Sequence, residues 1–476
     1  MPCGPLLFNV SDITMIKRIL ILGAVALIVT GCTLKPGGTK EHEAKLEEAG
    51  AVYQKPFAQR TLPEIPTPAT WEDVLRRALL ANGDLEAAYW EWNAAVAEID
   101  QDSAYPNSNI NLGFDYMFTR ESMKAWDRTT VSGSFDPSTG GLMWPSKISK
   151  MGDIAFARAQ AAASRFENAK FQLQLKVLTA YLDLALMEEK IRLAKANLGL
   201  TQLLHDTSAQ RVQTGGAQQD FFRVEVEHNM QINDLQNMEA QASSMRAMLN
   251  GMLARDAQAA LSLPPVLPPA RHIPADDAAL IAAAVDRNPR LAELAHQVQG
   301  RTDAIELAKR AYIPDFSPTA AITGNVAQSV GAMVMIPTNL PKIRGAIREA
   351  KAMLQSSQAM ARQTRSDTAS QFVASLYALR NAERQERLLL TQVLPAAERI
   401  NVSNRPAYAA GTVNFIDMIE GQRTVLEVRE AVAEARIERE KRLAELEALA
   451  GVDVETLSAP TTAATTAPTT ALNEKE

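Results

Sequence analysis

Two acidic residues late in the chain have a spacing that suits cation binding. Asp417 and Glu420 stand three residues apart, shortly after Gly411, and a helix that begins there places both carboxylates on one face. Two interpretations are open. Acids in the first turn of a helix stabilise it through the helix dipole, whereas in a symmetric oligomer the same acids form a ring around an axis, which selects cations.

A related pattern occurs earlier in the chain. The stretch RVQTGGAQQDFFRVEVE, from Arg211 to Glu227, has its own glycine break at Gly215 and Gly216, followed by Asp220. Asp220 lies one residue closer to the first glycine than Asp417 lies to Gly411, so the two stretches are similar but not superimposable. Both predict a turn between two helices.

The sequence contains none of the patterns that mark an enzyme or a cofactor site. A P-loop, a glycine-rich dinucleotide turn, an HExxH motif and a nucleophile elbow are all missing from it. The histidines have no ligand spacing and are interpreted as helix-surface residues: His42, His205, His228, His272 and His296. We therefore predict no catalytic residue, no cofactor and no metal site.

One helix is unusually rich in methionine. Thioethers bind soft ions such as Cu(I), but methionine at helical spacing more often fills a core because its side chain is adaptable. The sequence favours core filling and leaves metal binding as the alternative. The residues concerned are Met230, Met238, Met245, Met248 and Met252.

The composition favours long, closely packed helices. Of 476 residues 46% are hydrophobic, yet only 5% are aromatic, and the formal net charge is −6. Few aromatic side chains argue against an α/β enzyme core, and the acidic balance gives no electrostatic footprint for nucleic acid. Nucleic acid is not an expected partner.

The N-terminus has the organisation of an export signal. Lys17 and Arg18 precede the uncharged run ILILGAVALIVTG and then Cys32, which is the order of a signal peptide. VTGC resembles a bacterial lipobox, so we expect a signal peptide over 1–31 with its true start at Met15, and a lipidated Cys32. An ordinary secretory signal and an uncleaved anchor helix are the alternatives. Residues 32–69, rich in proline, glycine and charge, are expected to form a lipid-anchored extended segment.

The remainder of the chain is an internal repeat. WEDVLRRALLANGDLEAAYWEWNAAVAEIDQDSAYPN aligns with DDAALIAAAVDRNPRLAELAHQVQGRTDAIELAKRAYIPD, an offset of roughly two hundred residues that suits a duplicated half-protein. We place the first repeat at 70–256 and the second at 276–457. A proline-rich linker over 257–275 joins them, and a disordered tail follows at 458–476.

Each repeat contains one predicted β-hairpin between helical segments, at about 108–145 and about 315–337. Alternation of Leu112, Phe114 and Tyr116 with smaller or polar residues predicts a strand. The second hairpin lies in an uncharged stretch long enough for a membrane helix, but prolines and glycines interrupt it. A lone hairpin has open edges that lipid does not tolerate, so four strands must act together.

Long helices follow each hairpin. Apolar residues recur at spacings of three and four residues from Ala155 to about Arg211, which predicts a helix. At a rise of 1.5 Å per residue, such a helix is far too long for one globular core. Paired across their glycine breaks, the helices predict coiled-coil hairpins.

The chain resembles the TolC-like outer membrane efflux proteins, most specifically in Tyr408-x-x-Gly411-Thr412 followed by the two acids. The resemblance covers residues 70–451. It implies a mainly α fold with a small membrane β part: a coiled-coil tunnel, and a transmembrane β-barrel that trimerisation completes with four strands per protomer. It also implies an acidic periplasmic gate of Asp417, Glu420 and Asp220. The helix-tip turns that contact an adaptor would contain Gly215, Gly216, Tyr408, Gly411 and Thr412.

The resemblance implies a passive function. We expect an outer-membrane channel subunit of a tripartite export system in a Gram-negative bacterium, anchored by lipid and working with a periplasmic adaptor and an inner-membrane pump. A periplasmic coiled-coil adaptor or scaffold lipoprotein that does not span the membrane is the alternative. The exported substrate cannot be read from the sequence.

Overall fold

The computed structural model describes residues 33–452 apart from 106–109, 119–121, 136–142, 214, 216–217, 272–276, 279, 282–286, 326, 410–411 and 414. The chain forms two compact units, each built from three stretches of sequence. Unit 1 contains Met1–Gln54, Ala87–Phe166 and Ala292–Gln363. Unit 2 contains Lys55–Glu86, Glu167–Leu291 and Thr364–Glu476. The predicted signal peptide and tail lie outside the described residues.

Helices make up most of both units, as predicted. Local sequence explains where they begin: Thr70 and Asp73 form a capping box at the start of α3, and Pro145 occupies the first position of α5. None of the described helices has the length and hydropathy of a membrane span. The helices are α2 Thr39–Gly50, α3 Trp71–Ala81, α4 Gly83–Asp102, α5 Pro145–Gln213, α6 Gln218–Met252, α8 Pro289–Arg310, α9 Leu340–Leu388, α10 Leu394–Ala409 and α11 Phe415–Ala450.

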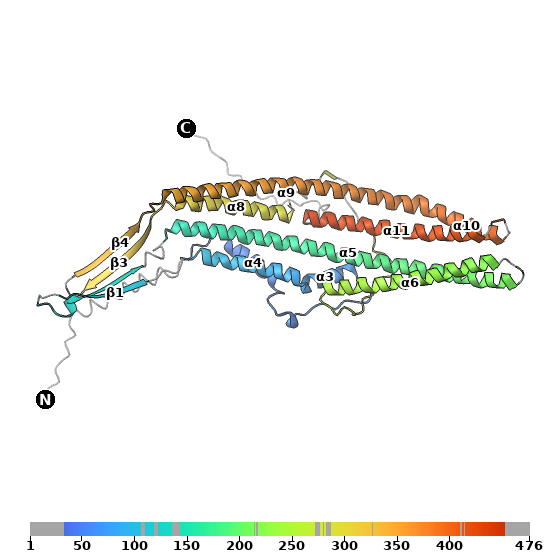
Figure 1. The fold of residues 1–476 in the computed structure, drawn as a ribbon, viewed down its shortest axis with the longest axis horizontal. Coiled ribbons are helices and arrows are strands. Elements are labelled where there is room, and N and C mark those ends of the chain that lie inside the picture. Colours follow the sequence, from blue (N-terminus) through green and yellow to red (C-terminus); the bar gives the residue numbers. More distant parts are fainter. Residues whose placement is uncertain are drawn as a thin grey trace, which may run out of the picture. The chain divides into compact units, whose positions relative to one another are not determined.

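Four antiparallel strands form one sheet in unit 1 (Figure 1). Strands β1 (Ile110–Tyr116) and β2 (Thr129–Phe135) form one hairpin, and β3 (Asp315–Thr323) and β4 (Ala327–Met335) form the other. The two hairpins join through β2 and β3, giving the order β1-β2-β3-β4. The prediction of a mainly helical fold with four strands is confirmed.

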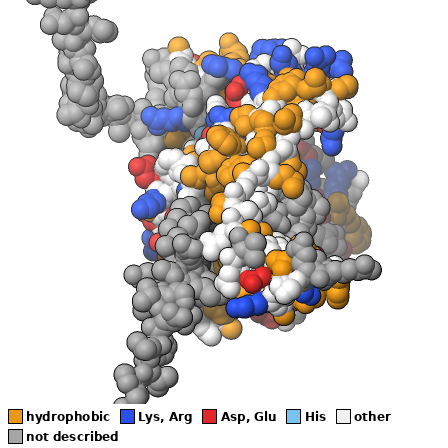
Figure 2. All heavy atoms as spheres, turned by 90° about the vertical axis from the view of Figure 1, so that its left-hand side faces the viewer, with side chains coloured by type: hydrophobic (Ala, Val, Ile, Leu, Met, Phe, Trp, Pro, Cys, Tyr) orange, Lys and Arg blue, Asp and Glu red, His pale blue; other side chains and the backbone are white. Residues whose placement is uncertain are grey.

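The sheet has one apolar and one polar face. Its register aligns Phe114, Val131 and Ile322 across three strands, and Leu112, Ala320 and Val330 across all four, with Gly133 between them. On the opposite face the hydroxyls of Thr130 and Thr323 lie 2.9 Å apart. The apolar side chains are exposed, with Leu112 at 80% and Val330 at 89%. Figure 2 looks onto the strand end of the molecule, where hydrophobic side chains gather in a band.

The base of the sheet is held by contacts between the two repeats. Lys147 Nζ donates to the carbonyl of Ile313 and to the Asp315 carboxylate, each at 2.8 Å. The ring of Trp144 lies edge-on to Phe316 at 6.0 Å. Lys147 is buried, so its charge needs this partner. Polar contacts thus fix where the strands leave the helices.

Part of the segment before the first repeat is helical, where an extended chain was predicted. Residues Thr39–Gly50 form α2, which buries Thr39, His42, Leu46 and Gly50 along one face. Proline and glycine near α2 mask the helical spacing of these four residues in the sequence. Gly50 is required there because a Cβ would lie 1.9 Å from the Tyr89 hydroxyl.

His42 is buried, which corrects its interpretation as a surface residue. Its Nε2 accepts a 2.9 Å hydrogen bond from Trp92 Nε1, and its ring contacts Phe156. Burial lowers the pKa of His42, and the nearby charges of Lys45 and His296 lower it further. A hydrogen bond with the backbone at Ala159 raises this pKa but does not reverse the shift. A neutral imidazole therefore holds α2 against α4 and α5.

Unit 2 contains a hydrophobic core and a buried ionic cluster. Phe372, Leu379 and Leu443 are among the residues of this core. Beside α11, Arg271 pairs with Glu440 at 3.0 Å and with Glu447 at 2.9 Å. Both carboxylates are almost fully buried, so each needs the guanidinium.

One turn interrupts the helical run between α9 and α10. Residues Leu389–Val393 form the π-helical turn η4, and Pro395 follows in α10. Proline lacks the N–H that an α-helical ladder requires, and a wider turn accommodates such a break.

Candidate functional site: the ends of the helical hairpins

Helices α5 and α6 turn at Gly215. The backbone of Gly215 has φ +96°, a left-handed conformation that favours glycine, and its N–H donates to Val212 O at 3.2 Å. Farther along the pair, Lys195 of α5 and Glu239 of α6 form an ion pair. The predicted turn is present, and Figure 1 shows the two helices side by side.

Helices α10 and α11 form the second hairpin end. The backbone N–H and Oγ1 of Thr412 both donate to Ala407 O, at 2.9 and 3.0 Å, which closes the end of α10. Gly421 allows close packing, since a Cβ there would lie 2.7 Å from Asn404 Nδ2. The same Nδ2 donates to the Asp417 carbonyl at 3.0 Å, so Asn404 fixes the start of α11.

A small apolar core joins the two hairpin ends within unit 2. Val224 of α6 and Met418 of α11 are buried against each other, and Leu204 and Ile419 pack around them.

Asp417 and Glu420 are exposed. Asp417 lies in the first turn of α11, as the glycine break predicted. The Glu420 carboxylate lies 3.5 Å from Arg423 Nη1, and its side chain keeps 59% of its surface exposed. The geometry suits both interpretations, dipole stabilisation and a charged ring.

Cys32, Gly216 and Gly411 lie outside the described residues. Asp220 belongs to α6 and Tyr408 to α10.

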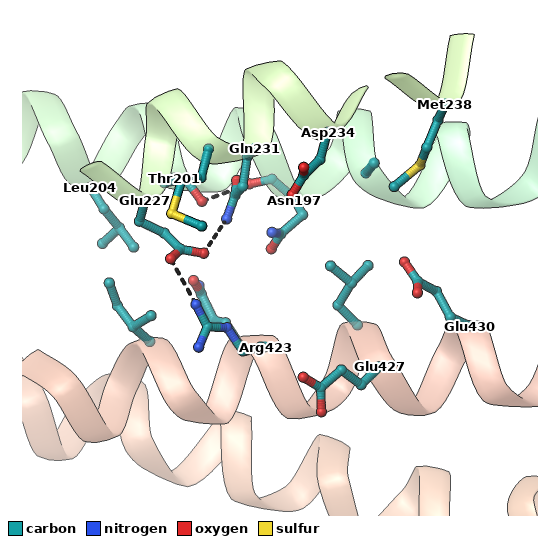
Figure 3. A pocket seen from close by; sticks show the side chains of 15 residues that line it. Asn197, Thr201, Leu204, Glu227, Gln231, Asp234, Met238, Arg423, Glu427 and Glu430 are labelled. Carbon is teal, nitrogen blue, oxygen red and sulfur yellow. Dashed lines mark hydrogen bonds and ion pairs between the residues drawn. The ribbon is translucent and has the colours of Figure 1, made fainter. Parts of the chain in front are cut away.

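An ion pair that sequence reasoning missed connects the two hairpins. Arg423 Nη2 of α11 lies 2.7 Å from Glu227 Oε2 of α6, and Gln231 Nε2 donates to the other oxygen of Glu227 at 3.0 Å. Figure 3 shows the three side chains converging. Nothing local in the sequence indicates that residues 196 apart are partners.

These side chains line a cavity of about 260 Å³ among α5, α6 and α11. Asp234, Glu427 and Glu430 add negative charge to its wall (Figure 3). Burial raises the pKa of Glu430, and the charges of Glu434 and Glu427 add to the effect while Lys190 opposes it. The cavity therefore favours cations over anions.

The methionines of α6 do not fill a core. None of the five is buried in the chain, and Met230 and Met248 are more than half exposed. Met230 and Met238 line the cavity instead. The favoured interpretation is therefore wrong, because the amphipathic pattern of α6 does not distinguish a core face from an open one.

The second half of the sequence matches a known family. Residues 280–452 match the sequence profile of outer membrane efflux proteins, and this range includes β3, β4 and the α10–α11 hairpin end. This part of the chain is therefore similar to that family. Among curated proteins, no sequence matches it significantly.

Solved structures show that the similarity in fold extends beyond the matched residues. The outer-membrane channel OprN has a TM-score of 0.66 at 16% identity, covering 85% of this chain and 92% of that chain. CusC, whose structures concern transmembrane channel formation, has a TM-score of 0.66 at 16% identity, covering 83% and 96%. The open MtrE outer membrane channel of Neisseria gonorrhoeae has 0.65 at 16%, covering 81% and 89%. The fold is that of outer-membrane channels.

Proposed function

We propose that three copies of this chain form a passive conduit across the outer membrane, through which a tripartite system exports its substrate. Each copy contributes four strands, which together make a twelve-stranded closed barrel. The helical hairpins form the periplasmic part of the conduit. No covalent chemistry is required.

The sheet is the observation that supports this proposal most strongly. In the described part of the chain, β1 and β4 each pair on one side only, and β4 is exposed along nearly its whole length. Open strand edges are not tolerated in lipid. A barrel closed by three copies pairs both edge strands of each copy with those of its neighbours. The apolar face then contacts lipid and the hydroxyl-rich face lines the pore.

At the periplasmic end, we assign Asp417 and Glu420 to the constriction. Three copies bring six carboxylates around the axis, and their mutual repulsion opposes closure unless cations or basic side chains compensate it. In this proposal the Arg423–Glu227 pair, which links α11 to α6, holds the α10–α11 hairpin against the α5–α6 hairpin in the closed state. Opening requires this contact to break.

The same proposal includes two protein partners, a periplasmic adaptor and an inner-membrane pump. The exposed turns at Gly215 and Thr412 contact a periplasmic adaptor, which in turn binds an inner-membrane pump. A lipid on Cys32 adds a membrane anchor, which is durable when it carries more than one acyl chain. Removing that lipid would release a peripheral scaffold from the membrane. A barrel protein would stay in the membrane and resist carbonate extraction.

Single-channel recording in planar bilayers tests the constriction. The Asp417→Ala/Glu420→Ala variant is expected to show lower cation selectivity and a smaller open probability, because the carboxylates that attract cations and oppose closure by mutual repulsion are gone. Glu306→Ala removes an exposed acid from α8 and serves as the matched control. Unchanged selectivity in the double variant would exclude these acids from the constriction, and the absence of any conductance from the wild-type trimer would reject the channel itself.

A further inference from the structure

Two histidines that are distant in sequence face each other across the α5–α6 hairpin. The rings of His205 and His228 have centroids 5.7 Å apart and planes inclined by 28°. Phe221 flanks His205 at 5.2 Å. His205 keeps 26% of its side chain exposed, so ions in solution can reach the pair.

A polar chain of contacts orients His205. Its Nδ1 lies 3.4 Å from Asp206 Oδ1, and Gln202 Nε2 donates to the same oxygen at 3.0 Å. A carboxylate near Nδ1 favours the tautomer that carries its proton there, which leaves Nε2 free to bind a metal. Histidine ligands in metal sites are commonly held by such a carboxylate.

The separation of the rings also suits a shared ion. Two imidazoles on one tetrahedral Zn²⁺, with Zn–N bonds of about 2.0–2.1 Å, bring their ring centroids to roughly 5 Å. The observed 5.7 Å is close to this spacing.

We propose that His205 and His228 form a two-histidine site for a borderline divalent transition metal ion such as Zn²⁺ or Ni²⁺. Imidazole nitrogen is a preferred ligand for these ions. No group of three or more His, Cys, Asp or Glu side chains is placed to hold a metal among the described residues, so water completes the coordination. One imidazole comes from each helix, and the ion therefore cross-links α5 to α6 near their shared turn.

The site is independent of the channel's conducting role. A metal that binds the folded hairpin more strongly than the unfolded chain raises thermal stability as its concentration increases. The ion would thus stiffen the helix pair that, in the proposed function, contacts the adaptor.

Calorimetric titration of the full-length protein in detergent, purified without a histidine tag, tests this proposal with NiCl₂ and ZnCl₂ as probes. We expect one ion bound per chain. His205→Phe and His228→Phe preserve the stacked rings but each removes a ligand, so each should abolish saturable binding. Asp206→Ala should weaken binding by about ten-fold, and Phe221→Leu, which changes only the flanking ring, should leave it unchanged.

A spectroscopic measurement separates this site from binding elsewhere. Echo modulation of bound Cu²⁺ should report two imidazole nitrogens in the wild type and at most one in either single variant. Saturable binding that persists in both phenylalanine variants would overturn the proposal, as would the absence of saturable binding to wild-type protein that migrates as a heat-modifiable trimer.

Discussion

Val330 and Ser329 are neighbours on β4 that point to opposite faces of the sheet, and together they test the orientation of the barrel wall. Val330 lies on the apolar face opposite Ala320, and Ser329 on the polar face opposite Ala321. Both are near the middle of a nine-residue strand. Replacing each in turn by arginine adds the same side chain at the same depth.

The two variants should differ strongly in stability. Arginine on the lipid face near the bilayer midplane destabilises a barrel by about 2–4 kcal/mol, which amounts to roughly 6–12 kcal/mol for three copies. At Ser329 the guanidinium enters a wide aqueous pore, where it remains hydrated and the effect should be small. Val330→Arg should therefore assemble poorly and Ser329→Arg normally.

Heat-modifiable migration and urea titration in liposomes measure the difference. Val330→Arg should lose most of the trimer band and lower the urea midpoint, whereas Ser329→Arg should resemble the wild type. Equal losses in both variants would show that the strand is not a wall between lipid and water. A harmless Val330→Arg would show that the apolar face does not contact lipid.

Three further predictions concern the helical units. Arg423→Glu should increase the open probability several-fold, because an exposed ion pair contributes about 0.2–1 kcal/mol, and adding Glu227→Lys should reverse the change in bilayer recordings. Glu447→Gln leaves the buried charge of Arg271 with one partner and should lower unfolding stability by about 3 kcal/mol in denaturant titration. Burial lowers the pKa of His42, so the unfolded chain takes up the proton first. The stability that neutral His42 contributes is complete above pH 6.5 and declines as the pH falls towards the lower pKa of His42 in the folded state. Hydrogen exchange of α2 should show this decline, and His42→Gln should abolish the pH dependence.

Local patterns were sufficient to predict the strands and the turns. Alternation at Leu112 and Phe114 indicated a half-exposed strand, and Gly215 marked the end of a helix. Asp417 lies in the first turn of its helix, where the glycine break placed it. Each of these features depends on neighbouring residues in the sequence.

Features that depend on tertiary packing were not predicted. The Arg423–Glu227 pair and the seam between β2 and β3 join distant segments, so neither leaves a local signal. α2 was not predicted because its short apolar face can be recognised only from its packing against α4 and α5. The pairing of His205 with His228 was recoverable in principle, since the chain folds back at Gly215 between them.

The seam between β2 and β3 determines when the sheet can form. Thr130 and Thr323 meet across it although 193 residues separate them, and closing so long a loop is entropically unfavourable until intervening helices have docked. Each hairpin can form early, but the complete apolar face assembles late in folding. Until then its hydrophobic side chains and strand edges are free to aggregate. Substitutions that slow docking of the helices should therefore reduce the yield of inserted trimer, even where they lie far from the membrane.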